Sequence, residues 1–427
     1  MSFSNIMDSN RYTADSPDDP LIAARERVLG PANRLFYDRP VHLVRGQGSH
    51  VFDIDGARYL DAYNNVVSVG HCHPHVIDAV TRQLSTLNTH TRYLHRGIVD
   101  YSERLLATMP TEIDQVMYAC SGSEVNDFAL RVAEIYTGAT GIIVTLDAYH
   151  GNTAAVTAIS PSLGGTTTVA TNVRTVPPPT NPAQFVDDVE RAAAELTSAG
   201  HGVSCLIADT IFSSDGIYPD PSVLGPVVDI VHRHGGVFIA DEVQPGFART
   251  GDSFWGFSRH GVIPDLVTMA KPMGNGMPVA AMAARSAVLK PFAVGVPYFN
   301  TFGGNPVSIA AAGAVLDVIE DEDLLGNAAE AGAHLRTELS RIAEGDPRIG
   351  DVRGAGLYIG VEVVSDPDAK TPDRAGARRL VNALRERHVL ISVCGHDGNV
   401  LKIRPPLVFS SADVDWFCTE FEAVLAV

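Results

Sequence analysis

The residue types best suited to chemistry in this sequence are an aspartate and a lysine, each at the end of an apolar segment. Asp241 follows GGVFIA, and Lys271 follows LVTMA about 30 residues later. Both segments predict β-strands, so both side chains are expected at carboxyl ends of strands, where ligands bind in open α/β sheets. Burial there lowers the pKa of a lysine amine and prepares it for Schiff-base chemistry, while a carboxylate can pair with a protonated aromatic nitrogen. Val243 lies on the same side of the strand as Asp241 and could pack on the face of such a ring.

A third motif could hold a phosphate. CSGSEVN, at 120–126, joins a predicted strand to a predicted helix, and Gly122 and Ser123 lie at the helix start. Free backbone amides, a glycine that permits close approach and a hydroxyl form a phosphate cradle there, although a serine-capped helix looks the same in sequence. Tyr149, in DAYHG, could stack on a planar coenzyme or belong to the core. Taken singly, Asp241 could be a helix cap and Lys271 a solvated loop residue, but together with this motif they indicate one site.

The elements that must position these residues alternate between strand and helix. Because the strands are about 25 to 40 residues apart, the pattern predicts a mostly parallel sheet covered on both faces. A small antiparallel meander is expected around the Asp55-Gly56 turn, and a long helix from 307 leads into a terminal α+β domain. The strands are predicted at 115–120, 141–147, 203–209, 235–243, 266–271 and 278–284, and helices at 76–87, 124–138, 186–200 and 222–235.

Composition excludes several classes of partner. The 427 residues carry a net charge of −18, which argues against nucleic acid and against anionic membrane surfaces. The five cysteines have no paired spacing, and residues 1–20 read as a polar, mobile arm without a signal peptide, so we expect a cytoplasmic protein. The only His/Cys cluster, His71-Cys72-His73, places neighbours on opposite faces, and we predict no metal site.

Five motifs together resemble one family. SGSEVN, YHG, DEVQPGFARTG, TMAKPMGNG and TFGGNP occur in this order and resemble the class III (ω-type) aminotransferases, which are fold-type-I enzymes that use pyridoxal 5'-phosphate. The resemblance runs from about residue 33 to the C-terminus. It implies a mostly parallel seven-stranded sheet in a large coenzyme-binding domain at 66–315. A smaller α+β domain would combine the arm and meander at 1–65 with the C-terminal part at 316–427.

The resemblance also implies roles for individual residues. Lys271 would hold the coenzyme as an imine and move protons, and Asp241 would keep the ring nitrogen protonated. Gln244 would lie near the ring hydroxyl, with Val243 and Tyr149 on the two ring faces.

The phosphate end of the coenzyme would involve two subunits. Gly122 and Ser123 would bind the phosphate of their own subunit, and Thr301 would bind that of its neighbour. The resemblance therefore implies a homodimer with shared active sites, which could pair further into a tetramer.

A closer resemblance lies outside the coenzyme motifs. The segments RLFY at 34–37, YNNV at 63–66, VGHCHP at 69–74, LNTHTRYLH at 87–95 and GNVLKIRPPL at 398–407 resemble the ethanolamine-phosphate phospholyase branch. Because these segments do not belong to the shared coenzyme motifs, they carry information about the substrate.

Four residues form the predicted substrate site. Many class III aminotransferases have a second glutamate where this chain has Ser214, in DTIFSS, and a phosphate dianion would gain a hydroxyl there and avoid a repelling carboxylate. Lys402 and Arg404 are two apart in a predicted extended segment and would share one side, and Arg92 could add to this positive patch. Solvated surface charge is the alternative for all three basic residues.

These observations favour elimination. We expect a phospholyase that converts O-phosphoethanolamine to acetaldehyde, ammonia and phosphate. The alternatives are a class III aminotransferase acting on an amine or ω-amino acid, and a coenzyme-binding protein without turnover. The sequence leaves open a phosphorylated hydroxylysine or an aminophosphonate as substrate.

Overall fold

A seven-stranded sheet forms the centre of the molecule. The computed structural model describes residues 19–164 and 169–426. The strand order is β4-β10-β9-β8-β7-β5-β6, and only β10 runs antiparallel to its neighbours. This confirms the predicted mixed, mostly parallel sheet. The strands are β4 (Gln115–Ala119), β5 (Ile142–Thr145), β6 (Val173–Val176), β7 (Cys205–Asp209), β8 (Val237–Asp241), β9 (Leu266–Met269) and β10 (Ala280–Ala284).

Helices cover both faces of this sheet, because its strands are apolar on both sides. In β8, Val237 and Ile239 join the core beneath α4, whereas Phe238 and Ala240 join the core on the α7 side. Alternating side chains of a strand point to opposite faces, so one apolar run supplies both cores. The first core is completed by α4 (Gly122–Thr137) and α9 (Ser286–Gly295), and the second by α6 (Pro182–Ser198), α7 (Leu224–Arg233) and α10 (Pro306–Asp321).

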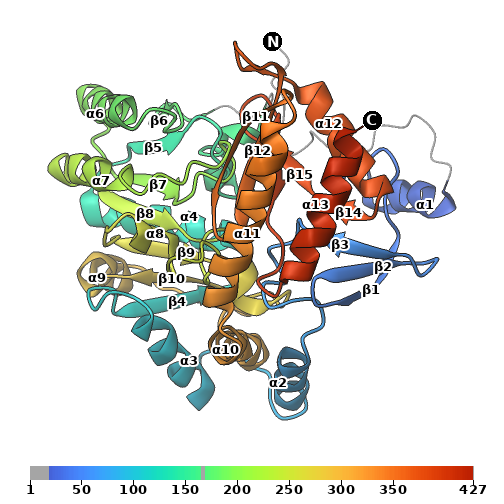
Figure 1. The fold of residues 1–427 in the computed structure, drawn as a ribbon. Coiled ribbons are helices and arrows are strands. Elements are labelled where there is room, and N and C mark those ends of the chain that lie inside the picture. Colours follow the sequence, from blue (N-terminus) through green and yellow to red (C-terminus); the bar gives the residue numbers. More distant parts are fainter. Residues whose placement is uncertain (1–18, 165–168, 427) are drawn as a thin grey trace.

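The two ends of the chain build smaller sheets beside the central one (Figure 1). In the first, β1 (Leu43–Gln47), β2 (His50–Asp53) and β3 (Arg58–Asp61) form the predicted meander, and β14 (Val389–Leu390) pairs parallel with β3. The second has the order β11-β12-β16-β15, with β13 paired to β12. Its strands are β11 (Ile349–Ala355), β12 (Tyr358–Asp366), β13 (Thr371–Pro372), β15 (Ser392–Cys394) and β16 (Val400–Ile403). The domain limits at 65 and 315 stay predictions.

The other helices lie around these sheets. They are α1 (Pro20–Leu29), α2 (Pro74–Leu84), α3 (Arg96–Ala107), α5 (Ala154–Thr157), α8 (Gly256–Arg259), α11 (Leu324–Glu344), α12 (Arg374–Glu386) and α13 (Ser411–Leu425). In the described ranges, no helix has the length and apolar character needed to cross a bilayer. The arm predicted over 1–20 falls outside the described residues up to 18, and α1 begins at Pro20.

Candidate active site

Lys271 lies at the carboxyl end of β9, at the first position of the short 3-10 helix Lys271–Gly274. Its φ is +23°, a region that residues with a Cβ rarely adopt and that costs about 1–3 kcal/mol. Desolvation lowers the pKa of its amine to about 8, with a further contribution from the nearby Arg404 guanidinium. A substantial share of the amine is therefore neutral near physiological pH, as proton transfer and imine chemistry require.

Asp241 faces the same cavity from the end of β8, and its carboxylate orientation is fixed. Its Oδ2 accepts from Asn126 Nδ2 at 2.9 Å and lies 2.7 Å from His150 Nδ1, while Oδ1 accepts from the backbone amide of Val243 at 3.1 Å. Asp241 and His150 are both buried, so these hydrogen bonds form away from bulk water. Asn126 and His150 were not predicted as site residues. Their presence inside the SGSEVN and YHG motifs was the only signal.

Glu242, the next residue, points to the other side of the chain from Asp241. It is fully buried and accepts from Thr210 Oγ1 and from the amides of Gly256 and Phe257, each at 2.8 Å. Burial raises the pKa of its carboxyl to about 7. Glu242 therefore holds neighbouring segments together and does not face the cavity.

A cavity of about 360 Å³ separates Lys271 and Asp241 from the start of α4. Gly122 and Ser123 line it at the helix N-terminus, where free amides attract anions. A Cβ on Gly122 would lie 3.2 Å from Val243 Cγ1, so the glycine leaves room at the wall. Gly151 has a φ of +136°, and a Cβ there would collide with Ser123 Oγ. Both glycines thus keep the cradle open.

This donor set fits pyridoxal 5'-phosphate. Tyr149 and Val243 line the cavity as an aromatic and a branched apolar surface, which suit the two faces of a planar ring. Asp241 would supply the acid for a ring nitrogen, Lys271 the amine for an aldehyde, and the α4 terminus the phosphate cradle.

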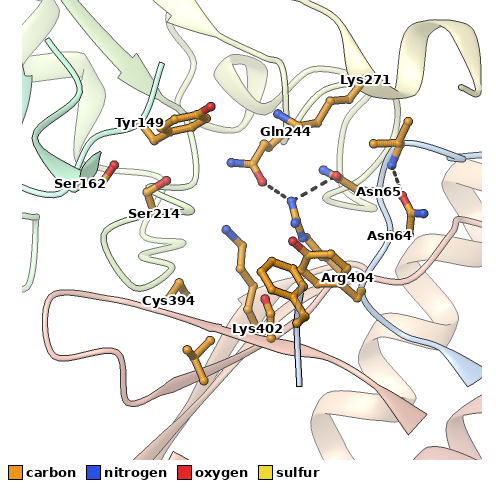
Figure 2. Close-up of a pocket in the computed structure, with 15 residues that line it drawn as sticks. Asn64, Asn65, Tyr149, Ser162, Ser214, Gln244, Lys271, Cys394, Lys402 and Arg404 are labelled. Carbon is orange, nitrogen blue, oxygen red and sulfur yellow. Dashed lines mark hydrogen bonds between the residues drawn. The ribbon is translucent and has the colours of Figure 1, made fainter. Parts of the chain in front are cut away.

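A second cavity of about 250 Å³ adjoins the first and shares Tyr149, Gln244 and Lys271 with it (Figure 2). Two buried cations, Lys402 and Arg404, line this second cavity and are 7% and 8% exposed. The structure therefore brings these two predicted substrate residues into one pocket with the lysine that would act on the substrate.

The partners of these two cations are neutral. Lys402 Nζ donates to the carbonyl of Ser213 at 2.9 Å, and Arg404 Nη1 donates to Asn65 Oδ1 at 3.1 Å and to Gln244 Oε1. No ion pair found within 19–164 and 169–426 includes either cation. Ser214, also predicted, lines the same cavity. Desolvation, and then Arg404, lowers the pKa of Lys402 to about 7. Buried cations without carboxylate partners are costly, so an anion bound in this pocket would offset that cost.

Two predicted residues lie elsewhere. Arg92 packs its guanidinium 4.0 Å from the centre of the Phe299 ring and lines a separate cavity, so within one chain it does not join Lys402 and Arg404. Thr301 is exposed in the loop before α10. The sequence grouped Arg92 with the other two by charge alone, which does not report distance in the fold.

Known proteins match almost the whole chain. The model of the family described as aminotransferase class-III matches residues 36–425. A Drosophila melanogaster protein named alanine–glyoxylate aminotransferase 2-like is 40% identical, covering 95% of this chain and 86% of its own. The Caenorhabditis elegans ethanolamine-phosphate phospho-lyase homolog 1 is 34% identical, covering 96% and 94%. Among solved structures, an Arthrobacter phospholyase in complex with phosphoethanolamine is 41% identical, with a TM-score of 0.93, covering 95% of this chain and 99% of its own.

Proposed function

The chain belongs to the class-III aminotransferase family, whose coenzyme is pyridoxal 5'-phosphate, and from that premise we propose that it is a phospholyase. Family membership confirms the resemblance found in the motifs. The proposed reaction eliminates phosphate from a small amino phosphate ester, with O-phosphoethanolamine as the substrate. The observation that carries the proposal is the buried pair Lys402 and Arg404, which has neutral partners and opens onto Lys271. The similar Arthrobacter phospholyase, solved with phosphoethanolamine, supports it.

The residues around the two cavities can perform this elimination. When bound, pyridoxal 5'-phosphate stabilises negative charge on the carbon that carries the substrate amine. Asp241, oriented by Asn126 and His150, would supply a negative charge for the ring nitrogen of the bound coenzyme. Lys271 Nζ would take a proton from the carbon that bears the amine; the electron pair left there forms a double bond to the neighbouring carbon, whose bond to the phosphate oxygen breaks so that phosphate leaves with that bond's electrons. Lys402 and Arg404 hold the departing phosphate, and water then releases ammonia and acetaldehyde.

The Arg404→Ala variant should bind phosphorylated substrate far less well. Removing a buried, charged hydrogen-bond donor should raise the KM for O-phosphoethanolamine about 10- to 100-fold, because charge-assisted bonds contribute about 1.5–3 kcal/mol. Steady-state kinetics with an unphosphorylated amine and pyruvate should show a much smaller change. Arg379→Ala, which removes an exposed guanidinium from α12, is the matched control and should leave both values unchanged. Equal losses for both substrates would place Arg404 outside the phosphate site.

Phosphate binding should also depend on pH through Lys402. Its pKa is lowered to about 7, so its ammonium is present below that pH and is lost above it. The KM for O-phosphoethanolamine should therefore rise as the pH increases from about 7 to 9, while the phosphate, with a second pKa of about 6, stays a dianion. Lys402→Arg keeps its charge throughout this range, so the rise should disappear in that variant. A wild-type KM that stays flat over this range would contradict the assignment.

A transaminase is the second candidate, because the Drosophila relative is named as an alanine–glyoxylate aminotransferase. Assays with three substrates separate the candidates. O-phosphoethanolamine is supplied without pyruvate, whereas an ω-amino acid and an unphosphorylated amine are each supplied with pyruvate. The proposal expects the highest kcat/KM for the phosphorylated amine without pyruvate. A strict requirement for pyruvate with every substrate would favour the transaminase. The absence of any coenzyme absorbance change with all three would leave the non-catalytic alternative.

We also propose that the enzyme is a homodimer. Large apolar side chains are exposed around Arg92 and Thr301, among them Leu94, Phe299 and Phe302. A second chain covering them would bury this surface and could bring Thr301 to the coenzyme phosphate of its neighbour. Sedimentation of the holoenzyme measures this state directly. The cytoplasmic location stays a prediction.

A further inference from the structure

The YNNV segment at 63–66 lies beside the substrate cavity and has no role in the proposed reaction so far. It follows β3, and the carboxylate of Asp61 holds its turn by accepting from the amides of Tyr63 and Asn64 at 3.1 and 3.0 Å. This turn buries Asn65 to 1% exposure, whereas Asn64 remains partly exposed and accepts from the amide of Val66.

The orientation of the Asn65 amide follows from its partner. Arg404 can only donate, so the atom 3.1 Å from its Nη1 must be the carbonyl oxygen of Asn65. Asn65 Nδ2 is then left buried with no hydrogen-bond partner among the residues that the structure describes. Figure 2 shows the Asn65 side chain pointing toward Arg404 and Gln244 at the wall of the cavity. An unpaired buried N–H is costly, and a ligand acceptor in this cavity would satisfy it.

Both acceptors of Arg404 Nη1 are amide oxygens. Asn65 Oδ1 and Gln244 Oε1 orient the guanidinium without neutralising it, and Tyr358 donates to the same Gln244 oxygen at 2.9 Å. A carboxylate at either place would form an ion pair with Arg404 and cancel one of the two positive charges in the pocket. The choice of amide over acid therefore preserves the affinity for an anion.

We infer that Asn65 is a specificity-determining residue, which holds Arg404 with an uncharged oxygen and donates its free N–H to the substrate phosphate. The inference rests on the proposed phospholyase function and assigns to Asn65 the choice between a dianionic and a neutral substrate tail. Asn64, its neighbour on the same cavity, makes no such contact with Arg404 and has no part in this choice.

The test compares Asn65→Asp with the matched control Asn64→Asp. Both add one negative charge to the same cavity, but only the first places it against Arg404. Calorimetric titration of each holoenzyme with inorganic phosphate should show affinity lowered about tenfold or more in Asn65→Asp and about twofold in Asn64→Asp. Steady-state kinetics should show a matching rise in KM for O-phosphoethanolamine in Asn65→Asp, with an unchanged KM for an unphosphorylated amine.

A second variant keeps the inference testable if Asn65→Asp does not fold. Asn65→Ala removes both the oxygen and the N–H without adding charge, and it should weaken phosphate binding about fivefold, the value of roughly one net hydrogen bond. Equal phosphate affinities in Asn65→Asp and Asn64→Asp, or an unaltered affinity in Asn65→Ala, would overturn the role of Asn65. The proposed function fails separately, if the wild-type enzyme releases no phosphate from O-phosphoethanolamine.

Discussion

Lys271→Ala is expected to lower turnover by about 10⁴-fold and to leave the coenzyme bound without a covalent link. Of the described residues that line this cavity, only Lys271 carries an amine; Lys402 lines the adjoining cavity, where its Nζ donates to the Ser213 carbonyl at 2.9 Å. Loss of the amine removes both the base that takes the substrate proton and the group that joins the coenzyme. The cradle at the start of α4 and the Asp241 carboxylate remain, so affinity for the coenzyme should persist.

Borohydride reduction followed by peptide mass analysis measures this link. The wild-type protein should carry the reduced coenzyme on the peptide that contains Lys271, and the variant should carry none. Lys290→Ala, which changes an exposed lysine of α9, is the control and should keep both label and turnover. Near-normal turnover in Lys271→Ala would show that this lysine is not the catalytic base.

Asp241→Asn should produce the second largest loss, about 10²- to 10³-fold in kcat. The substitution keeps the shape of the side chain but removes the charge that would hold the ring nitrogen protonated. It also disturbs the contacts at Oδ2, because Asn126 Nδ2 and His150 Nδ1 both lie within 2.9 Å of that atom. Stopped-flow or steady-state turnover per mole of bound coenzyme is the measurement.

Glu242→Gln is the matched control for Asp241→Asn, because it replaces the adjacent carboxyl group by the same kind of amide. It removes the neighbouring carboxyl on the opposite side of the strand, where three donors surround it at 2.8 Å. We expect a lower Tm, because the glutamine side chain has one acceptor oxygen where the glutamate has two, so one of the two backbone amides loses its acceptor. We expect little change in turnover per folded holoenzyme. Equal kinetic losses in Asp241→Asn and Glu242→Gln would mean that the effect is structural.

Local patterns were sufficient to predict six strands of the central sheet, all but β6, and to place the proposed coenzyme residues at the ends of these elements. Asp241, Lys271, Gly122 and Ser123 each sit at a strand end or helix start that the apolar periodicity marks, so their positions follow from short segments. The helix α3 was not predicted; of its residues Tyr101 and Leu105 are buried, so its apolar face is narrow.

Contacts between distant segments could not be predicted from one sequence. Asn126 is 115 residues from Asp241 along the chain, and Asn65 is 339 residues from Arg404. Nothing local to an asparagine tells which acid or guanidinium it will meet. The two-residue strand β14 is an edge strand of the first small sheet. It also could not be predicted, because it forms only by pairing with the distant strand β3.

The amount of phosphate released per active site from O-phosphoethanolamine, in the absence of any keto acid, is the most direct test of the proposed elimination. A phospholyase returns its coenzyme to the starting form after each elimination, so we expect many phosphates per active site, with ammonia in equal amount. A transaminase would stop after one amine had been transferred, with the coenzyme left in its amino form and the phosphate still esterified. That second outcome, or no phosphate at all, would contradict the proposed elimination.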